Sequence, residues 1–353
     1  MISARLIARA VRRVAPAASA DWADAMAMEI LHVEGPAAWR FAAGCLGAAV
    51  RMRIERMGRD TMACLRDMIE RPRATALACG VAATLAGLVY LATTGAPATM
   101  LAANAGALLL GLLVVAIGRS AVAPSWLVVA AGGAMIATAL LGVAPEGAAR
   151  WVRVAGLSLQ PSLILIPAAI VLHVLRRDAT TSAGVVAIAA GLALQPDRAM
   201  AAVLLAALLA GGRRSGAVPT AAAALAFAAT LARPDTLPAV PWVDGVLASA
   251  VVAGVVPGTA AILGTLVLLL PALAGLRDGR PETRAFGACW IAIVAAAALG
   301  NYPMPLVGFG GSAIIGYLLA AGALPRRGAA YRGGEIAAPI DDGGSAEPLL
   351  RTA

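Results

Sequence analysis

The stretch TLPAVPWVDGVLASAVVAG, residues 236–254, places one carboxylate where an apolar run begins again after a proline-containing connection. Asp244 therefore lies at the edge of a hydrocarbon slab, where a charged side chain is costly to keep. Such a residue is a functional-site hypothesis by default. The alternative is that Asp244 caps the helix that follows, a common role for Asp that contributes about 1 kcal/mol.

The composition is that of a membrane protein. Hydrophobic residues make up 61% of the 353 residues and charged residues only 13%, whereas soluble domains average about 25% charged residues. Ala, Gly, Leu and Val dominate, and small residues let helix backbones approach closely in lipid.

The charged and sulfur-containing residues argue against several other classes of protein. All 28 basic residues are Arg and the net charge is +9, but no basic patch is interleaved with aromatic residues, which argues against nucleic-acid binding. The four cysteines show no CxxC spacing and the two histidines are isolated, so neither a disulfide framework nor a metal site is indicated. No cofactor is expected, apart from a divalent cation if the chain is an active enzyme.

Apolar runs after Arg73 predict an all-α fold, a polytopic membrane helix bundle of about ten transmembrane helices. A helix needs about 20 apolar residues to span the hydrocarbon core. Several runs are shorter, so the helices that they form would be tilted or would cross only part of the bilayer. The predicted spans are residues 74–95, 98–118, 121–143, 157–175, 182–194, 199–211, 217–232, 246–274, 285–300 and 305–324.

Arginine is distributed unevenly over the predicted connections. One side carries clusters such as Arg213 with Arg214, and the other side holds only Arg150, Arg153, Arg198 and Arg233. Because cytoplasmic loops carry the excess of positive charge, this asymmetry predicts that both termini are cytoplasmic in a bacterial inner membrane.

The first 73 residues have a different pattern. Residues 2–14 place Leu6, Ala10 and Val14 on one helical face among arginines, and residues 21–33 repeat the pattern. Basic amphipathic helices of this kind suit an anionic membrane leaflet. The next apolar run, residues 41–50, is too short to span.

These patterns divide the chain into three parts. Residues 1–73 are expected to form a cytoplasmic helical segment on the membrane surface. Residues 74–325 form the bundle, and residues 326–353, with their Gly, Pro and Asp content, are expected to be a disordered cytoplasmic tail.

Four polar segments follow one another at the outer ends of the predicted spans. Residues 147–163 read GAARWVRVAGLSLQPSL, and residues 194–201 read LQPDRAMA. The Asp244 segment comes next, and residues 301–313 read NYPMPLVGFGGSA. This ordered set resembles the SEDS family, the FtsW/RodA-type peptidoglycan glycosyltransferases, which also have ten spans.

The resemblance implies a catalytic role for one matched residue. Asp244 corresponds to the family's essential Asp, which is thought to act as general base on a sugar hydroxyl of lipid-linked disaccharide while undecaprenyl pyrophosphate leaves. Cationic groups would take up the charge that develops on the pyrophosphate, and Arg binds phosphate bidentately. The candidate substrate-binding residues are Arg150, Arg153, Gln160, Asp197, Arg198, Arg233 and Asn301.

The sequence also departs from the family pattern. Leu163 stands where the family has Glu, Pro167 stands where it has Lys, and the long outer loop before the essential Asp is nearly gone. These departures favour a degenerate homologue in peptidoglycan biogenesis, cell division or cell shape. It would bind membrane lipid, an undecaprenyl-linked sugar or a partner such as a penicillin-binding protein. The alternatives are an active lipid II glycosyltransferase with Asp244 as base, and a small polytopic transporter or flippase.

Overall fold

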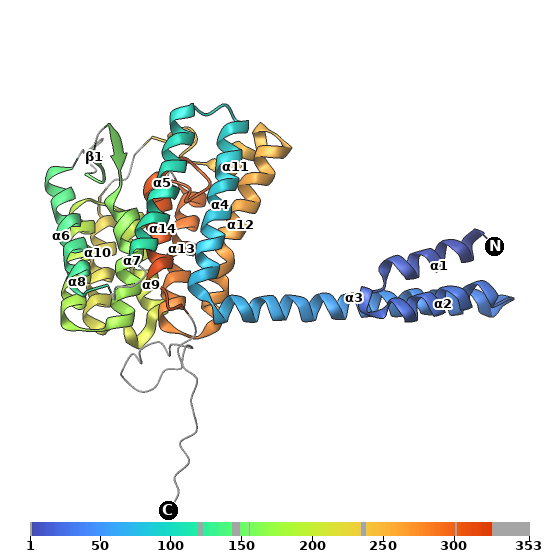
Figure 1. Cartoon of the computed structure of the whole chain (residues 1–353). Helices are drawn as coiled ribbons and strands as arrows, with labels where there is room; N and C mark the ends of the chain where they lie inside the picture. The colour runs from blue at the N-terminus through green and yellow to red at the C-terminus, as the bar shows by residue number, and fades with distance from the viewer. Residues whose placement is uncertain are drawn as a thin grey trace, which may run out of the picture. The chain divides into compact units, whose positions relative to one another are not determined.

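The computed structural model describes residues 2–118, 123–142, 149–154, 156–233, 238–300 and 302–326. Candidate residue Asn301 and residues 327–353 of the predicted tail lie outside this part of the chain. The chain divides between Met68 and Ile69 into two compact units, and each is described by itself (Figure 1).

The first unit consists of helices. They are α1 (Ile2–Val14), a 3-10 turn (Ala17–Ser19), α2 (Ala20–His32) and α3 (Pro36–Glu70), which runs to the unit boundary and slightly beyond. Their apolar faces cover one another in a small core of Ala8, Val11, Ala15, Ala23, Ala27, Ile30, Ala42, Cys45 and Ala49. An ion pair between Arg12 and Asp24, at 2.7 Å, joins α1 to α2.

This core corrects the predicted face of α1. Leu6 is 59% exposed, whereas Val11 is fully buried. The reason is that α1 packs against its neighbouring helices along the Ile7–Val11 side, where residues four apart lie on one face. The apolar sides of α1 and α2 are therefore largely used within the unit, and the placement of residues 1–73 on a membrane surface stays a prediction.

The second unit is a helix bundle with one short hairpin of strands. Its elements are α4 (Pro72–Thr93), α5 (Ala98–Ile117), α6 (Trp126–Leu141), β1 (Val152–Val154), β2 (Leu157–Leu159), α7 (Pro161–Arg176), α8 (Ala179–Leu194), α9 (Arg198–Gly211), α10 (Ala217–Leu231), α11 (Val246–Ala253), α12 (Val255–Asp278), α13 (Pro281–Leu299) and α14 (Gly311–Ala323).

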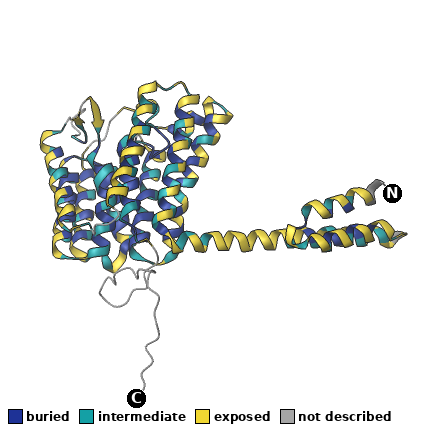
Figure 2. Ribbon diagram, in the orientation of Figure 1, coloured by how far each residue is buried: buried dark blue, intermediate teal, exposed yellow. Residues whose placement is uncertain are grey.

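The bundle confirms the predicted polytopic helical membrane fold. Among the described residues, α4, α5, α12 and α13 are long and apolar enough to cross a membrane, and α6, α7, α8, α10 and α14 are shorter apolar helices. Leucines on the outside of the bundle are exposed, for example Leu109 at 69% and Leu225 at 72%, as expected of a surface that faces lipid. Figure 2 shows this exposed exterior around buried central helices.

Local sequence signals set several helix starts. Proline occupies the first turn of α4, α7 and α13, where its missing N–H would be unpaired in any case. Asp178 caps α8 by accepting a hydrogen bond from the Thr181 N–H at 2.7 Å. Asp197 caps α9 in the same way through the Met200 N–H at 3.2 Å.

Three predicted spans differ from the structure. The predicted span 157–175 begins with strand β2 (Leu157–Leu159), and its helix, α7, starts only at Pro161. The predicted span 246–274 is broken at Gly254 into α11 and α12, because Gly254 has φ 138°, a conformation that side chains disfavour. The predicted span 305–324 begins as a non-helical loop, and α14 starts only at Gly311. All three departures lie in apolar segments that contain or adjoin Gly and Pro, which hydropathy does not distinguish from helix.

Small residues bring the central helices together. A Cβ added at Gly184 on α8 would meet the backbone of Val128 on α6, and one at Gly316 on α14 would overlap the Leu163 carbonyl oxygen on α7. Large side chains fill the remaining core, including Trp290 and Tyr317, whose ring centroids lie 4.8 Å apart. The close helix contacts agree with packing by small residues in lipid.

Candidate functional site

A buried polar cluster forms where α7 and α9 begin. The Asp197 carboxylate accepts from the Ser162 hydroxyl at 3.2 Å and from the Gln160 side-chain amide at 3.4 Å. Gln160 is 3% exposed and Asp197 is fully buried. Two of the candidate residues predicted from the sequence are therefore in direct contact, although 37 positions separate them along the chain.

Two further residues complete the cluster. The Gln160 amide donates to the Tyr302 hydroxyl at 3.1 Å, and the Gln160 backbone N–H donates to Ser312 Oγ at 2.9 Å. Burial raises the pKa of Tyr302 well above its ordinary value, and the negative charge of Asp197 adds to this effect. Tyr302 therefore stays a neutral hydroxyl that accepts from Gln160.

The four candidate arginines have different surroundings. Arg150 is 3% exposed and donates to the Pro196 carbonyl oxygen at 2.6 Å, directly beside Asp197. Arg153 is exposed on β1, and it lies opposite Ser158 of β2 in the antiparallel hairpin.

Arg198 and Arg233 bind helix ends. Arg198 donates to the Arg233 carbonyl oxygen at 2.8 Å, and Arg233 donates to the Leu194 carbonyl oxygen at 3.2 Å. Their guanidinium groups thus satisfy backbone carbonyls that helix ends leave open. Arg150 is the candidate arginine that the structure places with the polar cluster.

Asp244 occupies a turn that precedes α11. Its Oδ2 accepts from the Val240 N–H at 2.8 Å. The N-cap residue of α11 is Gly245, and the Asp244 carboxylate accepts from the Val240 N–H, which precedes the helix. The alternative in which Asp244 caps this helix is therefore wrong. Burial raises the pKa of the half-buried Asp244 carboxyl, and the Val240 N–H partly offsets the rise.

The loop of residues 302–310, here called the bridging loop, connects the Asp244 turn to the polar cluster. Its Met304 N–H donates to the Val243 carbonyl oxygen at 2.9 Å, and its Phe309 N–H donates to the Trp242 carbonyl oxygen at 2.7 Å. Tyr302 at its start contacts Gln160. The segments that carry Gln160, Asp197 and Asp244 are therefore joined through one stretch of backbone.

Helix α5 fixes the same loop from another side. Asn104, fully buried, donates to the Gly308 carbonyl oxygen at 3.0 Å and accepts from the Gly310 N–H at 3.2 Å. Sequence reasoning missed Asn104 and Tyr302. A polar residue inside an apolar span is a signal in its own right, and it could have identified Asn104, whereas nothing in the sequence distinguished Tyr302 from the neighbouring apolar residues.

The two positions that depart from the family pattern are part of the packed core. Leu163 is 2% exposed, and Pro167 is buried inside α7. Neither side chain can accept a proton or carry charge. Within the described residues, no group of three or more His, Cys, Asp or Glu could hold a metal ion.

The bundle and its buried polar cluster define a polytopic helical membrane protein with a polar centre at the helix ends. Its fold is similar to the crystal structure of the rod shape determining protein RodA from Thermus thermophilus, with a TM-score of 0.51 and 20% identity over 70% of this chain and 93% of that chain. An aspartate-to-alanine mutant of the same RodA gives a TM-score of 0.51 and 20% identity over 70% of this chain and 94% of that chain.

The sequence by itself matches no family model. It also matches no curated protein. The likeness to RodA confirms the SEDS-like fold that the ordered motifs indicated, and at 20% identity it is a likeness of fold.

Proposed function

We propose that this chain is a RodA-like protein of bacterial cell-envelope biogenesis, acting in cell division or cell shape. It binds a polyprenyl-linked sugar or a membrane partner and transfers glycosyl groups slowly or not at all. The observation that supports this proposal is the combination of a RodA-like bundle with the Asp244 turn, which the bridging loop connects to the Gln160–Asp197 cluster.

The polar end of the bundle suits an anionic, lipid-linked ligand. Arg153 is exposed on β1, and Arg recognises phosphate oxygens through two parallel hydrogen bonds. Asp244 is half-buried, and its carboxylate accepts one described hydrogen bond, from the Val240 N–H, which leaves acceptor capacity for a sugar hydroxyl. The polyprenyl chain would lie along the exposed apolar exterior of the bundle.

Weak or absent catalysis follows from what surrounds Asp244. Holding reactants in register can supply about 7–11 kcal/mol of a barrier. Leu163 and Pro167 offer no charge where the family has Glu and Lys, and only a short connection separates α10 from Asp244. The residues that would hold two lipid-linked sugars in register are thus largely missing.

Polymerisation of lipid-linked disaccharide tests this proposal. Purified protein, alone and with candidate penicillin-binding proteins, is expected to form little glycan, while binding of the disaccharide lipid weakens in Asp244→Ala. Glu34→Ala, at an exposed position of the first unit, is the matched control and should bind normally. Unchanged binding in Asp244→Ala would count against the site.

The alternative is an active lipid II glycosyltransferase with Asp244 as general base. Robust glycan product that disappears in Asp244→Ala would establish it. Because a base must be deprotonated and burial raises the pKa of Asp244, the rate would then fall, on acidification, at a higher pH than for an exposed Asp. A pH–rate profile would measure this shift, and a divalent cation would be tested in the same assay.

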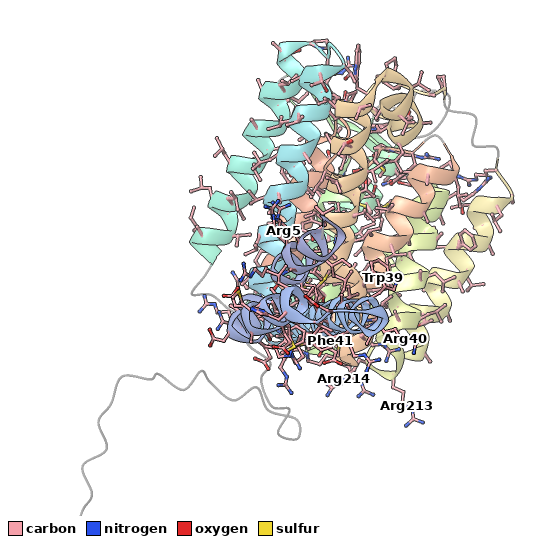
Figure 3. The ribbon with its side chains drawn as sticks, turned by 90° about the vertical axis from the view of Figure 1, so that its right-hand side faces the viewer. Arg5, Trp39, Arg40, Phe41, Arg213 and Arg214 are labelled. Carbon is pink, nitrogen blue, oxygen red and sulfur yellow. The ribbon has the colours of Figure 1, made fainter. Side chains whose placement is uncertain are left out.

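The orientation in the membrane is part of the proposal. Arg213 and Arg214 follow α9, and the exposed Arg213 side chain points away from the bundle (Figure 3). The excess of Arg in such connections predicts that they face the cytoplasm, together with both termini. Reporter fusions after Gly212 and after Thr236 should therefore report opposite sides of the inner membrane. An external signal at Gly212 would contradict this topology.

A further inference from the structure

The second half of α3 carries an apolar stripe that the core of the first unit does not cover. Val50, Ile54 and Met57 are 40%, 63% and 60% exposed, and their spacing of four and three residues places them on one helical face. The stripe continues along the same face through Thr61, Cys64, Leu65 and Met68. The first half of α3, in contrast, buries Ala42, Cys45 and Ala49 against α1 and α2.

Arginines flank this stripe on both sides. With about 100° of rotation per residue, Arg51 and Arg53 lie on opposite flanks of Val50, and Arg56 and Arg59 lie further round toward the polar face. An apolar stripe bordered by Arg is the pattern of a helix that lies in the plane of a membrane interface. Arg side chains can also extend their stems along apolar surface while their charge stays in water. Figure 3 draws the side chains of this unit, with Arg5 and Arg40 labelled.

The short connection between α3 and α4 indicates that a membrane covers the stripe. α3 ends at Glu70, and after the single residue Arg71 the chain enters α4, a 22-residue apolar helix long enough to span. The end of the stripe is therefore within a few residues of a bilayer surface. Arg71 has φ −125° and ψ 57°, which interrupts the helix before Pro72 and allows the two helices different directions.

A second copy of α3 fits the stripe less well. In a parallel pair of α3 helices, Ile54 and Met57 would lie in the seam. The residues that face Arg51 and Arg53 across such a seam are Leu46 and Gly58, and neither supplies a counter-charge. Anionic lipid headgroups would supply it.

We propose that the apolar stripe of α3, centred on Val50, Ile54 and Met57, is a lipid-binding surface that lies on an anionic membrane leaflet. This surface differs from the one that the sequence indicated on α1 and α2, whose apolar sides largely pack within the unit. It would hold the first unit at the bilayer that the bundle crosses.

Spin-label accessibility in the full-length protein tests the proposal. A label is placed by Ile54→Cys, Met57→Cys or, as the control on the opposite face, Arg59→Cys. The background carries Cys64→Ser and Cys79→Ala, because Cys64 is exposed and Cys79 partly so, whereas Cys45 and Cys289 are buried. The bundle keeps every variant in the membrane, so only the environment of α3 is compared.

The vesicles contain phosphatidylethanolamine with phosphatidylglycerol in one arm and phosphatidylcholine alone in the other. The ratio of oxygen to nickel-chelate collisions is expected to be several-fold higher at positions 54 and 57 than at position 59 in the anionic vesicles. The difference should shrink in phosphatidylcholine, and with Arg51→Glu and Arg53→Glu. Equal ratios at 54 and 59 in anionic vesicles would overturn the proposal, and so would strong dipolar coupling between labels at 54, which would show a second copy on the stripe.

Discussion

Asp197→Ala is expected to destabilise the bundle by about 3 kcal/mol or more. The fully buried carboxylate accepts from Ser162, Gln160 and the Met200 N–H, and each buried donor left without an acceptor costs about 1–3 kcal/mol. Loss of the α9 cap adds about 1 kcal/mol. The measurement is the thermal unfolding midpoint of the purified protein in a mild detergent.

Two variants make this result specific. Asp197→Asn retains one side-chain oxygen for the Met200 N–H and should lose less stability than Asp197→Ala. Asp244→Ala removes a half-buried carboxylate whose described partner is the Val240 N–H, and it should cost about 1 kcal/mol or less. Equal midpoints for Asp197→Ala and Asp244→Ala would contradict the importance of the buried cluster.

Gly316→Ala is expected to have a similarly large effect for a different reason. The added Cβ would overlap the Leu163 carbonyl oxygen, so α14 and α7 would have to separate. Overpacking of a tight contact costs about 1–3 kcal/mol and sometimes more, and here the obstacle is backbone that no rotamer change can move. Separation would also strain the 2.9 Å bond from the Gln160 N–H to Ser312, near the start of α14.

The control for this substitution lies on α5. A Cβ added at Gly106 meets nothing within 4 Å, and Gly106 lies inside a helix, so Gly106→Ala should stabilise the protein by about 0.5–1 kcal/mol. Opposite shifts of the unfolding midpoint in the two variants are expected. A Gly316→Ala protein as stable as Gly106→Ala would contradict the close contact between α7 and α14.

Hydropathy predicted the positions of most helices. The run at 217–232 corresponds to α10 (Ala217–Leu231), and the run at 74–95 corresponds to α4 (Pro72–Thr93). This works because lipid requires each span to satisfy its own backbone hydrogen bonds, so a long apolar run is helical whatever its neighbours are. The break at Gly254 was missed because it depends on backbone conformation, which hydropathy does not report.

The candidate site was predictable only in part. The ordered motifs identified Gln160 and Asp197, and in the structure Gln160 Nε2 donates to Asp197 Oδ2 at 3.4 Å. The motifs gave equal weight to Arg150 and Arg233, yet Arg150 is buried beside Asp197, whereas Arg233 is exposed and binds the end of α8. Sequence position cannot distinguish these two surroundings, because both residues lie in connections between apolar runs.

The sequence alone determined that this chain is a polytopic helical membrane protein, because apolar length and composition are local properties that lipid converts directly into helices. Only the tertiary structure decided which polar groups meet. The contacts of Asn104 with the bridging loop, of Tyr302 with Gln160 and of Met304 with the Asp244 turn join segments far apart in the chain. Such contacts depend on how close the helices approach one another, and small residues such as Gly316 set that distance through packing that no single segment encodes.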